Sequence, residues 1–473
     1  MNKTKMIATI GPASKSKQII KDMIENGVDV VRINMSHSTF DDARDIILNV
    51  RQIDREIDTV TGIMIDTRGP EMRIGELNQL SIKLESGNTI RIMKNQVVGN
   101  SEMVSISLPK AIDYIKVGNE LLLNDGSVIL EVVNKTDDAL ICEVKNDGYI
   151  RSNCSINIPK ADFDIKFLSE YDKETIKFSV MMQVDYIALS HVKTSLDVLD
   201  VNDMLIELSD DHIQLISKIE NKNAIEDIDN ILKNSDGVMV TRGDLGIEID
   251  LEKIPSAQKK IANAAKKHGK ICIIATEMLS SMLENSTPTR AEVSDVANSV
   301  LDGTDAIMLS SETAVGKFPV ETVKTANKII DEIEKEINYN DLLLAYDRND
   351  SLNIPDAICY SAVDCANRVS AKVIVCSTLS GKTAKQISHF RPSSPVIAIS
   401  PDQKTVSGLS INYGIIPIKV PMFDDTDEIV KFSVDSAKKI FNLEKNDKIV
   451  VTGSFPLNSV EYTNFIKIEE IKD

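Results

Sequence analysis

Eight short apolar segments, most of them separated by longer amphipathic stretches, limit more than any other feature how this chain can fold. Helical patterns such as residues 17–26, 41–53, 223–233 and 255–268 lie between them. Strands that alternate with helices favour a parallel sheet covered on its outer face, and eight such units predict a closed (β/α)8 barrel of the TIM type. The predicted strands are residues 6–10, 30–36, 61–66, 186–190, 213–220, 237–244, 271–276 and 306–310.

Residues 80–158 follow a different pattern. About 120 residues separate the third and fourth strands, which is far too long for a loop. Apolar and polar residues alternate at 80–84, 89–92 and 128–132, with turn signals between such runs. An insertion after the C-terminal end of a strand lies over the barrel mouth, so we expect a β-barrel lid domain over residues 70–158.

A second alternation of helices and strands predicts a C-terminal α/β domain. The polar residues 338–355 are expected to be a linker. The elements predicted after it are helix 355–369, strand 372–377, helix 383–390, strand 395–399, helix 426–441 and strand 447–452. The predicted domains are therefore the barrel over 1–69 and 159–337, the lid over 70–158, and the α/β domain over 338–473.

The charge and cysteine content of the chain limit its partners and location. The formal net charge is −18, which argues against nucleic acid or an anionic membrane as the main partner, because both require an excess of Lys and Arg. No stretch approaches the roughly 20 apolar residues of a membrane helix, and the N-terminus lacks a signal-peptide core. The six cysteines are scattered without metal-ligand spacing, as expected of buried free thiols in the cytoplasm.

Charged and hydroxyl side chains gather where the predicted strands end, and active sites form at that mouth of such barrels. Alternation places Arg32, Asn34 and Ser36 on one face of their strand. It does the same for Lys218 and Glu220. Five polar strand ends together indicate a functional site, because buried charge is costly unless paired or metal-bound. The residues concerned are Arg32, Asn34, Ser36, His37, Asp66, Thr67, Arg68, Glu71, Arg73, Lys218, Glu220, Arg242, Gly243, Asp244, Thr276 and Glu277.

This set suits a site that handles phosphate. Glu220 and Asp244 are able to hold a hard divalent cation such as Mg²⁺ and to leave positions for substrate oxygens. Arg32 and Lys218 supply positive charge for a phosphoryl group in transfer. Each residue alone also has a structural explanation, such as an ion pair between Lys218 and Glu220 or a turn at Gly243.

Seven short motifs lie in these segments or near them. They are residues 10–14 (IGPAS), 32–37 (RINMSH), 66–73 (DTRGPEMR), 217–221 (SKIEN), 242–246 (RGDLG), 275–279 (ATEML) and 288–292 (PTRAE). In order and spacing they resemble the motifs of the pyruvate kinase family, and the resemblance spans nearly the whole chain. It implies a glycolytic enzyme that transfers the phosphoryl group of phosphoenolpyruvate to ADP, giving pyruvate and ATP.

The resemblance also implies cofactors and residue roles. Glu220 and Asp244 would bind Mg²⁺ or Mn²⁺, and Lys218 would stabilise the migrating phosphoryl group. Thr276 would also lie near the path of the proton that converts the enolate to pyruvate. The implied substrate contacts are Arg32 for the phosphate, and the backbone of Gly243 and Asp244 with the Thr276 hydroxyl for the carboxylate. The implied nucleotide contacts are Asn34, Ser36, His37 and Arg73.

A K⁺ site is implied at Asn34, Ser36, Asp66 and the Thr67 carbonyl. Members of the family that require K⁺ carry Glu at the position of Glu71, whereas K⁺-independent members carry Lys, whose fixed ammonium replaces the mobile cation. Glu71 therefore predicts K⁺ dependence.

Residues 378–383 (TLSGKT), between a predicted strand and helix, suit a phosphate, with an ordinary capped turn as the alternative. The resemblance implies a phosphorylated allosteric effector here and a homotetrameric enzyme. Residues 453–464 lack the basic and glycine-rich character of the family's sugar-bisphosphate loop, which leaves the effector open. The implied contacts are Thr378, Ser380, Gly381, Lys382 and Thr383.

Further positions depart from the family pattern, among them Asn223, which replaces a commonly acidic residue. Asn153 and Cys154 stand where members often carry a lysine that faces the nucleotide, with Arg151 nearby. His191 stands where Phe is usual, for which we expect a change in packing. None of these departures is expected to touch Lys218, Glu220, Asp244 or Thr276.

Two other functions fit part of the pattern. One is another Mg²⁺-dependent barrel enzyme acting on phosphoenolpyruvate or pyruvate, a lyase or aldolase, which would need neither a K⁺ site nor a nucleotide lid. The other is a catalytically silent sensor that binds phosphorylated metabolites through residues 338–473. The presence of both Lys218 and Glu220 disfavours the sensor.

Overall fold

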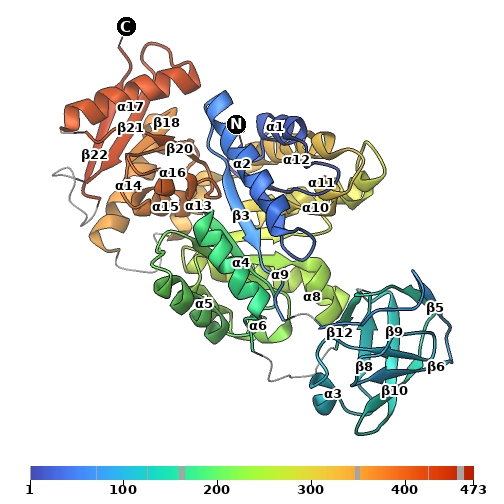
Figure 1. Ribbon diagram of the computed structural model, residues 1–473. Coiled ribbons are helices and arrows are strands. Elements are labelled where there is room, and N and C mark those ends of the chain that lie inside the picture. The colour runs from blue at the N-terminus through green and yellow to red at the C-terminus, as the bar shows by residue number, and fades with distance from the viewer. Residues whose placement is uncertain are drawn as a thin grey trace.

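The chain folds into three bodies that follow one another in space (Figure 1). A closed eight-stranded barrel lies in the middle, the inserted β domain lies at one end, and the C-terminal α/β domain lies at the other. The predicted fold class is therefore confirmed. The computed structural model describes residues 2–70, 72–124, 126–158, 166–346, 352–423, 425–454 and 463–472.

All eight predicted barrel strands form and pair in parallel. The order around the barrel is β1-β17-β16-β15-β14-β13-β3-β2, and β1 closes it by pairing with both β17 and β2. Met64, Tyr186, Met239 and Met308 belong to the buried cluster that fills the interior, so the barrel is a packed core and not a pore. The strands are β1 (Lys5–Thr9), β2 (Val30–Asn34), β3 (Gly62–Asp66), β13 (Tyr186–Leu189), β14 (Gln214–Ile219), β15 (Gly237–Thr241), β16 (Ile271–Ala275) and β17 (Ala306–Leu309).

Helices cover the outside of the barrel because their apolar residues recur every three or four positions. In α2 the buried residues include Ala43, Ile47 and Val50, and the Thr39 hydroxyl caps the first turn by accepting a hydrogen bond from the N–H of Asp42. The helices of this body are α1 (Lys17–Glu25), α2 (Phe40–Ile57), α4 (Glu170–Met181), α5 (Ser195–Glu207), α6 (Lys222–Glu226), α7 (Ile228–Asn234), α8 (Arg242–Glu248), α9 (Ile254–Lys267), α10 (Arg290–Leu301), α11 (Ser311–Ala314) and α12 (Pro319–Ile333), with short 3₁₀ turns at Leu251–Lys253, Ser280–Leu283 and Glu334–Glu336.

Two barrel strands, β2 and β15, end two or three residues earlier than predicted. β2 ends at Asn34 because Asn34 begins a turn, in which its side-chain oxygen accepts from the N–H of Ser36 at 3.0 Å and its carbonyl accepts from the N–H of His37 at 3.1 Å. The prediction that strand alternation continues to Ser36 is therefore wrong. β15 ends at Thr241, so Gly243 and Asp244 lie in the first turn of α8 and not on a strand.

The inserted domain is a curled mixed sheet of seven strands, in the order β4-β12-β8-β9-β10-β6-β7, with a separate pair β11-β5. Its two edges meet at a bridge between Ile74 and Ile106, where the N–H of Ser107 donates to the carbonyl of Arg73 at 2.8 Å. The sheet thus closes on an apolar interior of its own. The elements are β4 (Met72–Arg73), β5 (Ile82–Leu84), β6 (Thr89–Met93), β7 (Met103–Ser105), α3 (Ala111–Tyr114), β8 (Glu120–Leu123), β9 (Val128–Lys135), β10 (Ala139–Val144), β11 (Gly148–Ile150) and β12 (Ser155–Asn157).

The C-terminal domain is a five-stranded sheet in the order β20-β19-β18-β21-β22, parallel except for β22. The predicted linker is wrong in part, because Tyr339–Tyr346 form helix α13, which buries Leu343. Strands β20 and β22 and helix α16 were not predicted. The elements are α13, α14 (Ile354–Val369), β18 (Val373–Ser377), α15 (Lys382–His389), β19 (Val396–Ser400), α16 (Gln403–Ser407), β20 (Ile415–Lys419), α17 (Thr426–Phe441), β21 (Lys448–Gly453) and β22 (Phe465–Glu470).

The C-terminal domain docks against the N-terminal ends of the barrel strands. The Tyr186 hydroxyl, at the start of β13, accepts from the N–H of Ile411, which is itself part of the buried cluster in the barrel interior. Gln214, the first residue of β14, donates to the carbonyl of Gly408 at 2.5 Å. Arg391, just after α15, pairs with Asp305 at 2.9 Å immediately before β17. These contacts leave the opposite mouth, at the C-terminal strand ends, for a functional site.

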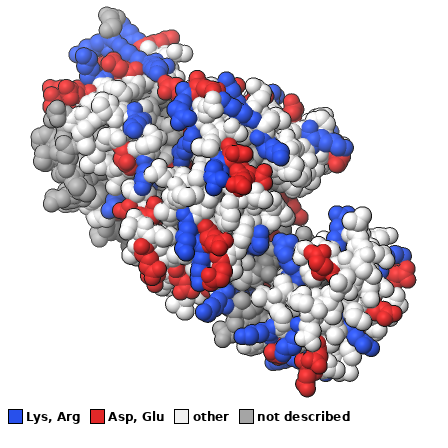
Figure 2. Space-filling model, in the orientation of Figure 1, with Lys and Arg blue, Asp and Glu red and all other residues white. Residues whose placement is uncertain are grey.

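The surface gives a mixed picture of charge. Figure 2 shows Lys and Arg interspersed with Asp and Glu over the visible face.

Within the part of the chain that the structure describes, no helix combines the length and apolar character needed to span a membrane. All six cysteines are free thiols, and four of them are buried.

Candidate active site

Lys218 lies at the centre of a buried polar cluster at the C-terminal ends of the strands. From β14 its Nζ donates to the Ser190 hydroxyl at 2.8 Å and lies 2.9 Å from Oε1 of Glu220 and 3.4 Å from Oδ1 of Asp66. Burial by itself lowers the pKa of Lys218, but the carboxylates of Asp66, Glu220 and Asp244 outweigh it and raise the pKa above its ordinary value. Lys218 is therefore a fixed positive charge at any physiological pH.

Arg32 lies beside this cluster on β2. Its Nε donates to Oδ2 of Asp66 at 2.6 Å, and its Nη1 donates to the Thr9 hydroxyl at 2.9 Å. Arg32 also lowers the pKa of Lys218, so the two cations are close enough to act on the same charge. Asp66, which is 1% exposed, balances both of them.

Glu220 follows β14 and is surrounded by donors. Besides Lys218, the Thr241 hydroxyl donates to its Oε1 at 3.2 Å, and the N–H of His191 donates to its Oε2 at 2.7 Å. Burial raises the pKa of Glu220, but Lys218 and His191 outweigh it and hold the pKa well below its ordinary value. The carboxylate is thus ionised and available to a cation.

The expectation that His191 only changes the packing and does not touch Glu220 is wrong. Its ring Nδ1 lies 3.2 Å from Oε2 of Glu220, the same oxygen that its backbone N–H contacts. Its backbone is left-handed, with φ of 60°, an uncommon conformation for a residue other than glycine. No local pattern predicts this contact, because it joins the loop after β13 to the end of β14.

Ser190 is a site residue that the sequence reasoning missed. Its hydroxyl lies 2.7 Å from the carbonyl of Thr67 and 3.0 Å from Oδ1 of Asp66, and it accepts from Lys218. Ser190 directly follows β13, so the same strand-end argument that found Lys218 would have found it, had the fourth strand been included.

Thr276 and Gly243 are brought together as the resemblance implied. The N–H of Gly243 donates to Oγ1 of Thr276 at 2.8 Å. Thr276 and Glu277 both have positive φ, 67° and 54°, which is strained for a β-branched residue such as threonine. Arg242 holds this loop, because its Nη2 donates to the carbonyls of Thr276 and Glu277 at 2.7 and 2.9 Å. Arg242 thus has a structural role at the sixth strand end.

The residues expected at the nucleotide and K⁺ sites lie in two bodies. Asn34, Ser36 and His37 form the turn after β2, and Thr67 follows β3 with its carbonyl facing Ser190. Arg73 lies on β4 of the inserted domain, where its Nη1 donates to the carbonyl of Asn153 at 2.8 Å. Glu71, on which the predicted K⁺ dependence rests, lies outside the described residues.

The carboxylates of Glu220 and Asp244 at the barrel mouth suit a divalent cation that is held by few protein ligands. Glu220 is ionised, and Asp244 in the first turn of α8 is close enough to raise the pKa of Lys218. Among the described residues no group of three or more His, Cys, Asp or Glu side chains is arranged to hold a metal. Two carboxylates suit Mg²⁺, which usually completes its shell with water and substrate phosphate oxygens.

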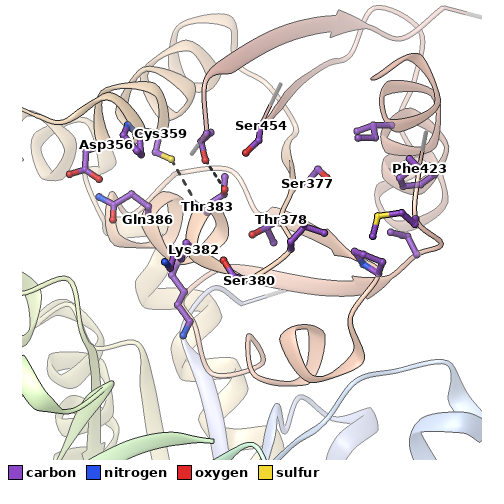
Figure 3. A pocket seen from close by; sticks show the side chains of 18 of the residues that line it. Asp356, Cys359, Ser377, Thr378, Ser380, Lys382, Thr383, Gln386, Phe423 and Ser454 are labelled. Carbon is purple, nitrogen blue, oxygen red and sulfur yellow. Dashed lines mark hydrogen bonds between the residues drawn. The ribbon is translucent and has the colours of Figure 1, made fainter. Parts of the chain in front are cut away.

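A second candidate site lies in the C-terminal domain, between β18 and α15. Thr378, Ser380, Lys382 and Thr383 line a cavity of about 370 Å³ (Figure 3). Gly381 forms the left-handed turn, with φ of 79°, that starts α15. The lining also includes apolar side chains, among them Met422, Phe423 and Ile429. Four of the residues expected to bind an effector phosphate thus line one cavity, and the fifth, Gly381, forms the turn between them.

This cavity is connected to the barrel through α15. Lys385, which also lines the cavity, donates from Nζ to Oε1 of Gln214 at 2.7 Å. Gln214 begins β14, the strand that carries Lys218 near its other end. Burial lowers the pKa of Lys385.

Comparison with known proteins agrees with this geometry. A family model described as the pyruvate kinase barrel domain matches residues 1–323, and a model of the pyruvate kinase alpha/beta domain matches residues 356–469. This chain belongs to the pyruvate kinase family. The predicted family and enzyme class are therefore confirmed.

Full-length pyruvate kinases are similar along the whole chain. The pyruvate kinase of Clostridium acetobutylicum is 37% identical over 473 residues, which cover all of both chains. That of Clostridium perfringens is 38% identical, again over all of both chains. That of Geobacillus stearothermophilus is 36% identical over all of this chain and 81% of its own length. The match to pyruvate kinases thus includes the inserted domain and the C-terminal domain.

Proposed function

We propose that this chain transfers the phosphoryl group of phosphoenolpyruvate to ADP at the barrel mouth, giving pyruvate and ATP. The observation that carries the proposal is the buried ammonium of Lys218, held by Asp66, Ser190 and Glu220 and close to Arg32. A charge fixed in advance stabilises a migrating phosphoryl group without reorganisation, which is the main source of catalysis in phosphoryl transfer.

Glu220 and Asp244 would hold Mg²⁺ or Mn²⁺. Two observations support this role. Burial raises the pKa of Glu220, but Lys218 and His191 outweigh it and keep the carboxylate ionised, and Asp244 lies close enough to raise the pKa of Lys218. The metal, when bound, would neutralise the oxygens of the phosphate and of the enolate.

Arg32 would bind the phosphate of phosphoenolpyruvate. A guanidinium has five N–H donors, and Asp66 and Thr9 engage Nε, Nη1 and Nη2, which fixes its plane and leaves further N–H groups for the substrate. The backbone of Gly243 and Asp244 would hold the carboxylate together with the Thr276 hydroxyl. Thr276 would also lie near the proton path to the enolate.

The nucleotide phosphates would contact Asn34, Ser36 and His37 in the turn after β2, and Arg73 from the lid. K⁺ would lie between Asn34, Ser36, Asp66 and the Thr67 carbonyl, which are oxygen ligands as a hard cation requires. The domain boundaries that accompany this proposal are 1–69 with 159–337 for the catalytic barrel, 70–158 for the lid and 338–473 for a regulatory domain.

The cavity beside α15 would bind a phosphorylated allosteric effector through Thr378, Ser380, Gly381, Lys382 and Thr383. The contact from Lys385 to Gln214 supports a regulatory role, because it joins the cavity wall to the strand of Lys218. By family resemblance the enzyme would be a cytoplasmic homotetramer.

The test is a coupled assay with phosphoenolpyruvate, ADP, Mg²⁺ and K⁺, in which lactate dehydrogenase reports pyruvate. We expect pyruvate to form only when ADP is present. Pyruvate formation without ADP would favour a lyase or phosphatase reaction. The absence of pyruvate with and without sugar phosphates and AMP would favour the silent sensor.

A further inference from the structure

Four polar groups of the protein lie within 3.2 Å of the two carboxylate oxygens of Glu220, two at each oxygen. Lys218 at 2.9 Å and the Thr241 hydroxyl at 3.2 Å contact Oε1, while the N–H of His191 at 2.7 Å and its ring Nδ1 at 3.2 Å contact Oε2. A carboxylate has about four lone-pair sites, two on each oxygen. A cation that binds Glu220 therefore competes with one of these four groups for a carboxylate oxygen.

Three of these four groups are held in place by their surroundings. The Lys218 side chain is 9% exposed and is also bound by Asp66 and Ser190, and Thr241 is 2% exposed. The N–H of His191 belongs to the backbone. The His191 ring differs from them, because the side chain is 32% exposed and turns about its own bonds. It can leave Oε2 without disturbing the backbone, and water can take its place as a partner.

Two further parts of the chain lie near the His191 ring. Glu248, on α8, is a second carboxylate within electrostatic reach of His191, since the ring opposes the rise that burial causes in the pKa of Glu248. On the other side the ring packs against Gly69, where an added Cβ would lie 3.0 Å from Cδ2 of His191. The ring thus has a second acidic neighbour besides Glu220, and it lies close to the segment that leads into the inserted domain.

We propose that the His191 imidazole competes with the divalent cation for Oε2 of Glu220 and thereby sets the metal affinity of this enzyme. The inference rests on the proposed role of Glu220 as a metal ligand. His191 acts through Glu220, so it is a positioning residue and not a catalytic residue. The family position usually holds Phe, which has no donor, so the competition belongs to this chain.

The test is a comparison of Mn²⁺ binding by wild type, His191→Phe and His191→Gln, without substrates, with free Mn²⁺ followed by electron paramagnetic resonance. Phe removes the competing donor and should tighten Mn²⁺ binding about threefold to tenfold, which corresponds to part of one hydrogen bond to a charged group. Gln keeps an N–H donor and should bind Mn²⁺ about as wild type does. Thermal unfolding of each variant shows that it is folded.

Two outcomes would overturn the inference. Weaker Mn²⁺ binding by His191→Phe would mean that the ring holds Glu220 in its binding position or ligates the metal itself. Equal binding would mean that the ring only fills space. In the coupled assay, the Mg²⁺ concentration at half-maximal rate should fall in His191→Phe by the same factor as the Mn²⁺ dissociation constant.

A Glu220→Gln variant separates this inference from the proposed function. We expect it to weaken Mn²⁺ binding by about tenfold or more, because an ionised ligand is lost. If Glu220→Gln binds Mn²⁺ like wild type, the proposed metal site itself is wrong. If it binds weakly while His191→Phe gains nothing, the metal site stands and the competition by His191 is refuted.

Discussion

Replacing Lys218 by methionine keeps the bulk of the side chain and removes its charge from between two buried carboxylates. The ammonium lies 2.9 Å from Glu220 and 3.4 Å from Asp66. Asp66 keeps Arg32 as its partner, whereas Glu220 keeps the hydroxyl of Thr241 and the donors of His191. Removing one partner of a buried pair costs about 3–5 kcal/mol of folding free energy, because an uncompensated charge remains.

This loss should be visible in the unfolding temperature and should depend on metal and pH. At about 2–4 °C per kcal/mol for a domain of this size, we expect a decrease of about 10 °C. A divalent cation that binds only the folded state stabilises it by about 2.7 kcal/mol at about 100 times its dissociation constant. It should therefore offset more than half of the lost folding free energy. In wild type the pKa of Glu220 is lower in the folded state than in the unfolded state, so the ionised carboxylate stabilises the fold at pH values above its ordinary pKa. This stabilisation is lost as the pH falls through the lowered pKa. Without Lys218 the pKa of Glu220 rises, so metal rescue should weaken already in mildly acidic solution.

The assay combines thermal unfolding by circular dichroism, with and without Mn²⁺, and steady-state kinetics. We expect kcat of Lys218→Met to fall on the order of 10³-fold, as expected when a transition-state cation is lost. Lys222→Met, the same change at an exposed site on α6, is the control and should alter neither quantity. If kcat survives and KM for phosphoenolpyruvate rises, Lys218 is a binding residue. An unchanged unfolding temperature that Mn²⁺ does not affect would refute the electrostatic reasoning.

Three further outcomes are expected. Replacing K⁺ by tetramethylammonium should remove most of the turnover in the coupled assay, since Glu71 offers no fixed ammonium; near-full turnover would contradict K⁺ dependence. Lys382→Gln should raise the half-saturating concentration of a phosphorylated activator about tenfold or more, in a titration with sugar phosphates and AMP, whereas Lys372→Gln outside the cavity should not. Arg391→Met should lower stability in urea by about 3–5 kcal/mol, because the buried Asp305 loses its charge partner. The same change at the exposed Arg368 should leave stability almost unchanged, and equal effects of the two changes would show that the docking contact is unimportant.

Much of the fold could be predicted because it depends on local periodicity. The barrel strands are buried on both faces and therefore read as apolar runs, and their helices show one apolar face. The missed elements have weaker patterns. Strand β20 contains Pro417 and β22 carries charged residues, as suits edge strands, and α13 buries Leu343 within a polar stretch.

The position of Lys218 at the barrel mouth was also predictable, because barrel geometry brings all strand ends together whatever their sequence. The partners of Lys218 and Glu220 were not. Ser190 and His191 follow β13, whereas Thr241 ends β15. The distances from their polar atoms to Lys218 and Glu220 depend on strand register and on backbone angles such as the positive φ of His191. Local sequence determines which faces are buried and hence the elements, whereas the donors that share one carboxylate are decided by tertiary contacts that no local pattern encodes.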